Sequence, residues 1–331
     1  MEHIEVESFL NPIAKGISRP SLVLCDDGNN YILKKEGEDN DGNSFDSTLI
    51  NEVISYKIAL YLGIPICDSA IAHINKDLIE FEPNIFFVNK FKEGDYFASL
   101  EQKPLVTNLL ENAAELIEMG KPYISRTWND FFKHVANKED FAKIIAFDFL
   151  IVNFDRFNHL DNFLVRKEND KNKFIAIDHG LAFFGGIWTT EKMKMLAGYN
   201  SKDEYWRDIF ATFEYIFGNF QKTTNLGFLF KSIETYINIT DLENNDFTDI
   251  IFKIESLSRQ TILEMFKDIP NEWFVDKNVQ ISYYTEFLLN HKNNIRHIIQ
   301  LLADQNYFTN FKGGKLKWIE EERKEKKGNI Q

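Results

Sequence analysis

Hydrophobic and polar positions divide the chain into two parts of different character. In the first part, short apolar segments alternate with polar turns, a pattern that predicts β-strands. Segments 21–25 and 30–35 flank residues 26–29, where Gly and Asn tolerate the positive φ of a hairpin turn. Two or three further strands are expected between residues 68 and 91, because residues 85–88 are apolar throughout, as in a strand buried on both faces.

One amphipathic helix interrupts these strands. Apolar residues at positions 49, 50, 53, 54 and 60 predict a helix over residues 47–62, and Gly63 and Pro65 end it.

From residue 94 onward, longer amphipathic patterns are typical of helices. One is expected over residues 105–119, and another begins near Asn137, whose side chain can cap it. Further helices are expected around residues 203–217, 228–237, 248–266, 279–290 and 294–305, before a charged tail from residue 313. This order predicts an α+β fold with a strand-rich part with one helix at residues 1–92 and a helix-rich part at residues 93–331.

Composition indicates a globular protein and limits its partners. The 331 residues are 44% hydrophobic and 15% aromatic, which is enough for a substantial core. The 38 basic and 51 acidic residues give a formal net charge of -13. This charge disfavours general binding of nucleic acid or of an anionic membrane, because both need a cationic surface. We therefore expect a protein or small-molecule substrate, and neither nucleic-acid nor membrane binding.

The cysteines and the N-terminus indicate the compartment. Cys25 and Cys67 form neither a metal-type pair nor a disulfide framework, which favours a reducing environment. The N-terminus lacks a basic region followed by an apolar core, and no apolar run is long enough to span a bilayer. We expect a cytoplasmic protein.

Candidate chemistry is concentrated between residues 153 and 180, which read NFDRFNHLDNFLV, a polar turn, and then FIAIDHG. A phosphoryl-transfer site needs a carboxylate that accepts the proton of the attacking hydroxyl. It also needs an amide oxygen and a second carboxylate that hold magnesium at the nucleotide phosphates. Asp155, Asn162 and Asp178 match these three roles in that order.

The spacing of these residues has a structural reason. Residues 169–172 supply turn chemistry, so residues 163–166 and 174–178 are expected to pair as strands. Such a hairpin would bring Asp178 next to Asn162, so that two hard oxygen ligands converge on one cation.

The strand-rich part contains residues that would complete this site. A turn before the first hairpin offers backbone N–H groups to phosphate oxygens. Its candidate residues are Gly16, Ser18 and Arg19.

A lysine and a glutamate are the other two candidates. Lys34 ends the second strand of the hairpin, and strand alternation sends Lys34 and Lys35 to opposite faces, one inward and one to solvent. Either lysine could face a nucleotide. Glu52 lies at the margin of the apolar face of the helix, where its carboxylate can reach a strand lysine.

Four segments together resemble the HipA-like kinases, in particular the branch with an Asp-Arg motif and an Ile-Asp-His-Gly motif. They are GISRPSLVLCDDGNNYILK, INEVISYKIALYLGIP, NFDRFNHLDNFLV and IAIDHGLAFF, and the resemblance covers about residues 16–184. It implies a bilobal protein-kinase-like fold that binds ATP and Mg²⁺, with residues 85–91 leading to the hinge that receives adenine. The implied site residues are Asp155 as catalytic base, Asn162 and Asp178 as metal ligands, Lys34 as phosphate lysine, Glu52 as its partner, and residues 16–19 as phosphate loop.

Two features depart from the family pattern. The base and the Asn are two residues further apart than in better-known HipA proteins. His179 replaces the Phe of the usual Asp-Phe-Gly motif, and we expect it to pack rather than to assist at the metal. Arg156 could balance the charge of Asp155 or contact an incoming phosphate, but we expect a structural salt bridge.

These observations predict an ATP- and magnesium-dependent kinase that phosphorylates a Ser or Thr hydroxyl of a protein. Self-phosphorylation of a serine within residues 36–47 and a small antidote or regulatory partner are further options. Three alternatives stay open: a nucleotide-binding scaffold without transfer activity, a kinase of a lipid or small molecule, and a metal-dependent phosphohydrolase. The hydrolase would use His159, Asp161, Asp178 and His179.

Overall fold

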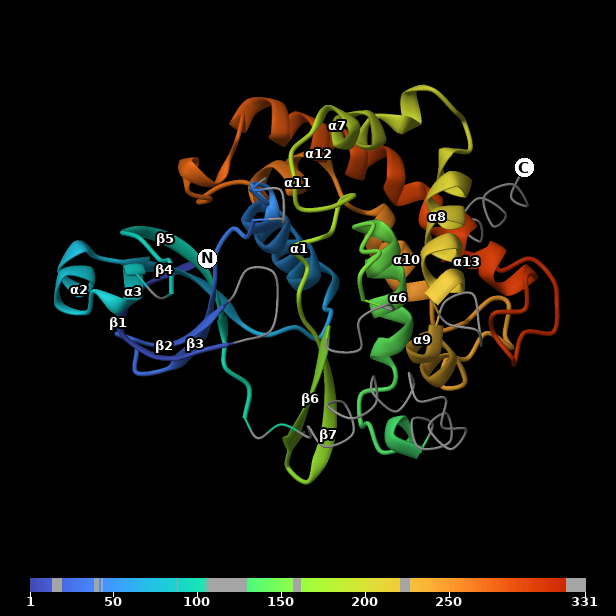
Figure 1. Ribbon diagram of the computed structural model, residues 1–331. Helices are drawn as coiled ribbons and strands as arrows, with labels where there is room; N and C mark the ends of the chain where they lie inside the picture. Colours follow the sequence, from blue (N-terminus) through green and yellow to red (C-terminus); the bar gives the residue numbers. More distant parts are fainter. Residues whose placement is uncertain are drawn as a thin grey trace.

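The first hundred residues form a five-stranded barrel, and helices dominate the part that follows (Figure 1). This arrangement is seen in a computed structural model of the chain. The structure describes residues 1–13, 20–38, 42, 44–87, 89–103, 105, 130–156, 162–220 and 227–319.

The barrel closes through one parallel pair of strands. The strand order is β1-β2-β3-β5-β4, with antiparallel neighbours except for β1 and β4. Ser21, Val23 and Cys25 of β2 are buried, because alternate side chains of a strand point to the same face. The strands are β1 (Glu2–Pro12), β2 (Ser21–Cys25), β3 (Asn30–Lys34), β4 (Ser69–Ile74) and β5 (Gly94–Leu100).

Two elements of the first part are confirmed. Strands β2 and β3 form the predicted hairpin, and Gly28 in its turn has a φ of 78°. Helix α1 (Thr48–Leu62) occupies the predicted range and ends at Gly63, which has a φ of 73°. Figure 1 shows α1 between the barrel and the helical part, and it contacts β5, α10 (Thr248–Glu255) and α11 (Arg259–Met265).

The expectation of a single helix and of a strand at residues 85–88 was wrong. The region holds two more helices, α2 (Lys76–Phe81) and α3 (Asn84–Phe87). The side chain of Asn75 accepts a hydrogen bond from the backbone N of Leu78 at 2.8 Å and so caps α2. An apolar run of four residues has no period that separates strand from helix, which explains the error.

Strand β5 was also missed, because it lies where helical patterns were expected to begin. It pairs with both β3 and β4, so the strand-rich part continues through Leu100 instead of ending at residue 92. Residues 85–91 precede β5, and the hinge that they were expected to lead to stays a prediction.

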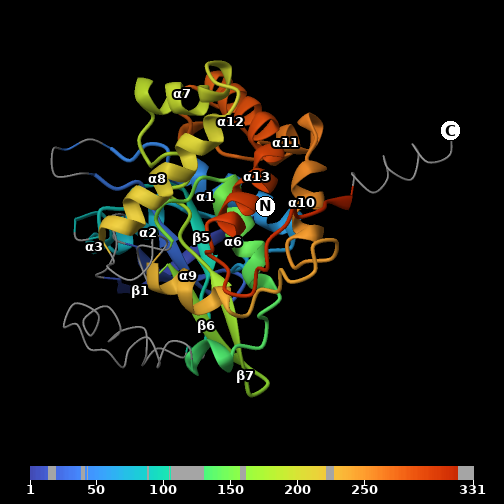
Figure 2. The ribbon, with the colours of Figure 1, turned by 90° about the vertical axis from the view of Figure 1, so that its right-hand side faces the viewer.

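The helical part surrounds α6 (Asp140–Leu150), a helix with nine buried residues. Helices α8, α9, α12 and α13 confirm the predicted patterns, whereas α7 was not predicted and residues 248–266 form two helices instead of one. Figure 2 views the molecule from the side of α8 and α13, with the barrel strands behind them. The helices are α7 (Thr190–Leu196), α8 (Tyr205–Phe220), α9 (Gly227–Glu234), α10 (Thr248–Glu255), α11 (Arg259–Met265), α12 (Lys277–His291) and α13 (Ile295–Asp304), with 3₁₀ turns at Gly198–Asn200, Asn271–Trp273 and Lys292–Asn294.

Local polar contacts explain two further differences from expectation. Ser258 accepts a hydrogen bond from the backbone N of Thr261 and starts α11, which separates it from α10. Asn137 does not cap α6 as predicted. Its Oδ1 accepts from the backbone N of Phe174 at 2.8 Å, so it ties the start of α6 to β7 (Lys171–Ala176). Most of the predicted helix at residues 105–119 lies outside the described residues.

The hairpin that carries the candidate chemistry is confirmed. Strand β6 (Phe163–Glu168) pairs antiparallel with β7 (Lys171–Ala176), and Phe163 lies opposite Ala176. Asn169 and Asp170 have positive φ values of 48° and 62°, which suit a two-residue hairpin turn.

Two hydrophobic clusters stabilise the molecule. One fills the barrel, and the larger one extends from α1 through α6 to the last helices. Among the helices of the described ranges, none combines the length and the apolar character needed to cross a membrane.

Removing Phe149 from the larger cluster tests this packing. Its ring is fully buried, and its centroid lies 4.5 Å from that of Phe213. We expect Phe149→Ala to lower the free energy of unfolding by about 3–5 kcal/mol, because a cavity replaces the ring. Phe81→Ala is the matched control, since the side chain of Phe81 is 84% exposed; we expect a change within about 0.5 kcal/mol. Equal effects in urea denaturation would contradict this description of the core.

Candidate active site

Lys34 connects the barrel to α1 and to the segment that follows β7. Its Nζ lies 2.5 Å from Oε1 of Glu52 on α1 and 3.2 Å from Oδ1 of Asp178 after β7. Lys35 points to the opposite face, as expected, but its Nζ donates to the carbonyl oxygen of Asn89 instead of facing only solvent. The structure therefore distinguishes the two lysines, and Lys34 is the one beside Asp178.

The charges of this trio support one another. Burial alone would lower the pKa of Lys34, but the charges of Asp178 and Glu52 outweigh burial and hold that pKa above its usual value. Burial raises the pKa of Glu52, and the charge of Lys34 opposes this effect. The charge of Lys34 lowers the pKa of Asp178, whose side chain is 50% exposed, so the ion pair outweighs burial there. Asp178 is therefore ionised at neutral pH.

Asp155 and Asn162 are in direct contact although they lie seven positions apart in the sequence. Nδ2 of Asn162 donates to Oδ2 of Asp155 at 2.7 Å. Because the amide nitrogen of Asn162 donates to Asp155, the amide oxygen of Asn162 is the atom suited to bind a cation. The backbone N of Asp155 donates to Oδ1 of Asn153 at 3.3 Å, which steadies the start of the loop.

Backbone hydrogen bonds place Asp178 beside this pair. The backbone N of Ile177 donates to the carbonyl oxygen of Asn162 at 3.2 Å, which extends the β6–β7 hairpin by one step. Asp178 then adopts a left-handed conformation with a φ of 60°. The convergence of Asn162 and Asp178 expected from the hairpin is thus present in the backbone.

Several residues with left-handed backbone lie around the candidate site. Val152 precedes the loop with a φ of 50°, and Phe183 and Phe184 follow Asp178 with φ values of 55° and 67°. Such conformations are costly for β-branched or bulky residues and are held only by the surrounding structure. They indicate that the segments on both sides of the site have a fixed shape.

Arg156 is fully buried and binds groups from three segments. Its Nε donates to Oδ2 of Asp148 at 2.7 Å, and its Nη1 donates to the carbonyl oxygens of Asn162 and, at 2.9 Å, Ile177. Its Nη2 lies 2.7 Å from Nε2 of His179. Because a guanidinium only donates, Nε2 of His179 accepts and the ring carries its proton on Nδ1. Arg156 therefore makes the expected structural salt bridge, and its buried head cannot meet an incoming phosphate.

His179 and Asp148 share this buried environment. Burial and the charge of Arg156 lower the pKa of His179 well below its usual value, so the ring is neutral. The ring packs edge-on against Phe147 with centroids 5.4 Å apart, which agrees with the packing role expected for it. Burial raises the pKa of Asp148 to about 6, against the opposing charge of Arg156.

The family model of HipA-like kinases matches residues 6–226, which is more than half of the chain. The chain belongs to the HipA-like kinase family. Family membership supports phosphotransferase activity, which generally uses ATP and a divalent metal ion.

A solved structure supports the fold of this HipA-like kinase. The crystal structure of the Helicobacter pylori proinflammatory kinase CtkA is similar, with a TM-score of 0.50 and 14% sequence identity. The match covers 91% of this chain and 96% of that chain. At this identity the likeness shows a shared fold alone. No curated protein matches the chain.

Some predicted site residues of this HipA-like kinase lie outside the described residues. They are Gly16, Ser18 and Arg19 of the expected phosphate loop, together with His159 and Asp161. Within the described ranges, no group of three or more His, Cys, Asp and Glu residues could hold a metal ion. Asn162 and Asp178 alone would not form such a group, because it requires three or more of these residue types. Magnesium commonly binds through few protein ligands.

Asn51 is a site residue that the sequence did not single out. It is fully buried on α1, one position before Glu52, and its Nδ2 donates to three carbonyl oxygens of the segment after Asp178. Its Oδ1 accepts from Tyr284 Oη at 2.7 Å. The only sequence signal was a polar residue within the apolar face of the helix. The three acceptors are Gly180 at 2.7 Å, Ala182 at 2.8 Å and Gly185 at 3.0 Å.

The segment after Asp178 needs a glycine at position 180, where it packs against α1. A Cβ at Gly180 would lie 2.4 Å from Cγ2 of Thr48 and 3.3 Å from Oε1 of Glu52. Any side chain at this position would push α1 away from the segment and disturb Glu52.

Lys192 on α7 completes the network around Asn51. It is 1% exposed, and its Nζ donates to the carbonyl oxygen of Gly185 at 2.6 Å and to Oδ1 of Asn51 at 3.4 Å. The Nζ also lies 5.4 Å from the ring centroid of Tyr284. Burial lowers the pKa of Lys192 to about 7.

A small cavity lies behind the Lys34 trio. It measures about 20 Å³ and is lined by Glu52, Cys67, Phe97 and Asp178, among others. This volume suits a water molecule and is too small for an adenine ring.

Breaking the buried pair of Arg156 and Asp148 tests its structural role. We expect Asp148→Asn to lower the free energy of unfolding by about 3–5 kcal/mol, because it leaves a buried charge without a counter-charge. The matched control is Asp208→Asn, which breaks a surface pair with Lys202 in which both side chains are more than 60% exposed. That change should cost about 0–1 kcal/mol. Similar losses in the two variants, measured in urea, would contradict the assignment.

The lowered pKa of Lys192 predicts a pH dependence of stability. Between pH about 7 and 10.5 the unfolded chain holds a proton on Lys192 that the folded protein lacks. Stability must therefore rise with pH in this window, by at most about 1.4 kcal/mol per pH unit. Lys192→Met should abolish this contribution, whereas Lys194→Met, on the exposed side of the same helix, should keep it. Parallel curves for the wild type and Lys192→Met in urea titrations from pH 7 to 10 would refute the prediction.

Proposed function

We propose that the protein is a kinase that transfers the γ-phosphoryl group of ATP to a Ser or Thr hydroxyl of a protein substrate. The observation that carries the proposal is the meeting of Lys34, Glu52 and Asp178, beside the contact between Asp155 and Asn162. A barrel strand, a helix and two loops far apart in the sequence all contribute to this one place. Family membership gives the reaction class.

Lys34 and Glu52 would act on the nucleotide. Glu52 is buried and fixes the Lys34 ammonium group through a 2.5 Å ion pair. A lysine held in this way can bind phosphate oxygens with little loss of side-chain entropy, because its position is already set. The predicted phosphate loop, with Gly16, Ser18 and Arg19, would supply backbone N–H groups to the phosphates.

Asn162 and Asp178 would hold magnesium. Both present hard oxygen atoms, and Asp178 is ionised beside Lys34, which fits the ligand preference of this ion. When bound, the ion neutralises charge on the phosphate oxygens. The protein side chains around it have the fixed positions described above, so alignment is built into the fold.

Asp155 would act as the base. In the transfer, the hydroxyl oxygen of the acceptor forms a bond to the γ-phosphorus, the bond from phosphorus to the ADP oxygen breaks, and the hydroxyl proton passes to the Asp155 carboxylate. Asn162 orients that carboxylate through its 2.7 Å hydrogen bond.

Self-phosphorylation of the segment before α1 can be narrowed to one residue. Residues 36–47 contain two serines, Ser44 and Ser47. Ser47 is fully buried, whereas Ser44 is exposed and its Oγ donates to Oε2 of Glu36 at 3.2 Å. Ser44 is therefore the serine that we propose as acceptor. A cytoplasmic location and a small regulatory partner stay predictions.

Incubation with γ-labelled ATP and magnesium tests the proposed reaction. We expect Asp155→Ala, Asn162→Ala and Asp178→Asn to lower the rate of label transfer about a hundredfold or more. Lys34→Met should do the same, while Lys35→Met is the matched control and should keep transfer near that of the wild type. Label at position 44 should disappear in Ser44→Ala.

Two results would support the alternatives instead. Nucleotide binding without transfer to any acceptor would identify a scaffold. Phosphate release that depends on a transition metal and needs no ATP would identify a hydrolase.

A further inference from the structure

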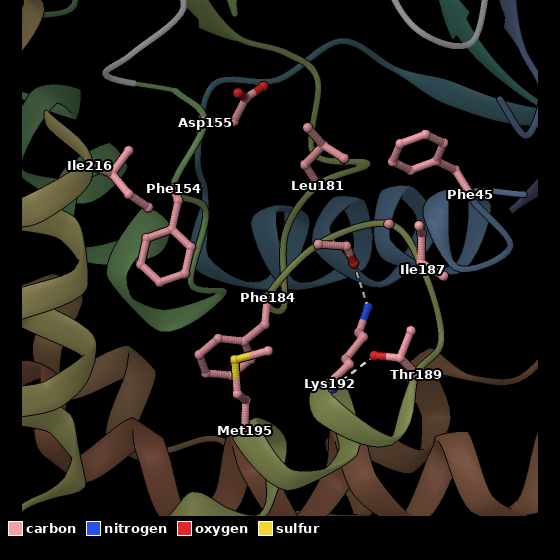
Figure 3. Close-up of a pocket in the computed structure, with 12 residues that line it drawn as sticks. Phe45, Phe154, Asp155, Leu181, Phe184, Ile187, Thr189, Lys192, Met195 and Ile216 are labelled. Carbon is pink, nitrogen blue, oxygen red and sulfur yellow. Dashed lines mark hydrogen bonds between the residues drawn. The ribbon is translucent and has the colours of Figure 1, made fainter. Parts of the chain in front are cut away.

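A cavity of about 430 Å³ opens beside Asp155 on the side of α7 and α8. Figure 3 shows Asp155 at one end of this cavity and Met195 and Lys192 at the other. We call it the α7 cavity. Its walls come from the segment after Asp178, from α7, from α8 and from the residues before α1.

The α7 cavity lies on the acceptor side of the site. Asp155 is in its wall, whereas Lys34, Glu52, Asn162 and Asp178 are not among its lining residues. A hydroxyl that gives its proton to Asp155 must come within hydrogen-bond reach of that carboxylate. Groups of the acceptor next to this hydroxyl would therefore enter the α7 cavity.

The lining of the α7 cavity is mainly apolar. Lys192, a lysine in its wall, is 1% exposed and donates to the carbonyl oxygen of Gly185 at 2.6 Å. The cavity thus suits an uncharged, apolar group better than a sugar phosphate or an acidic side chain. The apolar lining residues are Phe45, Phe154, Leu181, Phe184, Ile187, Met195 and Ile216.

A second cavity continues from the first. It measures about 270 Å³ and shares Phe154, Phe184 and Met195 with the α7 cavity. Its far wall is more polar and includes Lys202 and Asp208. Two adjoining hollows fit an extended chain with successive side chains better than one compact small molecule.

We propose that the α7 cavity binds a large apolar side chain of the acceptor protein, close in sequence to the Ser or Thr that receives the phosphate. The acceptor chain continues over the second cavity. This inference rests on the proposed function and names its substrate class: a peptide segment with Leu, Ile, Met or Phe near the acceptor residue. Burial of such a side chain contributes to substrate binding and does not act on ATP.

A library of Ser- and Thr-centred peptides with varied flanking positions tests the inference. We expect the wild type to select a large apolar residue at one flanking position. Replacement of that residue by Ala should raise the KM for the peptide about tenfold or more. The KM for ATP should not change.

Met195→Arg is the variant that tests the cavity itself. Met195 is 43% exposed, so the substitution places a charged side chain in the cavity without disturbing a buried position. It should raise the KM for the apolar peptide about tenfold and that for the Ala peptide less than about twofold. Tyr215→Arg is the matched control. Tyr215 is 72% exposed on α8, next to Ile216 and outside the cavity lining, and this variant should keep wild-type selection.

Binding of the same library, arrayed and probed with the Asp155→Ala protein, separates the two proposals. If the protein binds peptides with an apolar flanking residue and Met195→Arg removes this preference, the cavity proposal is supported. Absence of phosphorylation in the same experiment would then contradict only the proposed function. Transfer without apolar selection, or selection that Met195→Arg leaves intact, overturns the inference and leaves the kinase. If phosphate is transferred only to a lipid or small molecule, both the cavity proposal and the proposed protein acceptor are contradicted. The same holds if the protein shows neither peptide binding nor transfer.

Discussion

The burial of one guanidinium group determines how the candidate site is assembled. A charge out of contact with water must be paired and hydrogen-bonded, and Arg156 meets this requirement only where α6, the loop before β6 and the end of β7 come together. Asp148 supplies the opposite charge, and the backbone carbonyls of Asn162 and Ile177 supply further acceptors. Asp155 and Asp178 are the sequence neighbours of Arg156 and Ile177, so these contacts hold them in place. Neither carboxylate takes part in the pairing of Arg156 and Asp148.

Helix α1 provides a second, independent connection. Two successive residues, Asn51 and Glu52, reach different parts of the molecule, the carbonyls after Asp178 and the ammonium group of Lys34. The close approach of Gly180 leaves the helix little freedom to shift. Displacement of α1 would therefore disturb Lys34 and the segment after Asp178 together. Nucleotide and metal binding are expected to depend on the same helix position.

Short-range patterns in the sequence were sufficient for part of this structure. Turn residues predicted the β2–β3 and β6–β7 hairpins, and a period of 3.6 predicted α1, because these signals arise from neighbouring residues. Strand alternation placed Lys34 and Lys35 on opposite faces for the same reason. Strand β5 was missed, since pairing with β3 and β4 over long sequence distances decides its structure. The apolar run that includes α3 was taken for a strand, because so short a run has no period that separates strand from helix. Asn51 could not be identified as a site residue, because its partners lie about 130 residues further along the chain. The roles of the phosphate loop, base and metal ligands stay predictions.

The three carbonyl bonds made by Asn51 have a consequence for control of the enzyme. In many protein kinases, the stretch after the metal-binding Asp is ordered only when an added phosphate meets an arginine cluster. Here an internal side chain, assisted by Lys192 and Tyr284, gives this stretch its shape from the moment the chain folds. The stretch after Asp178 would therefore need no added phosphate to take its shape.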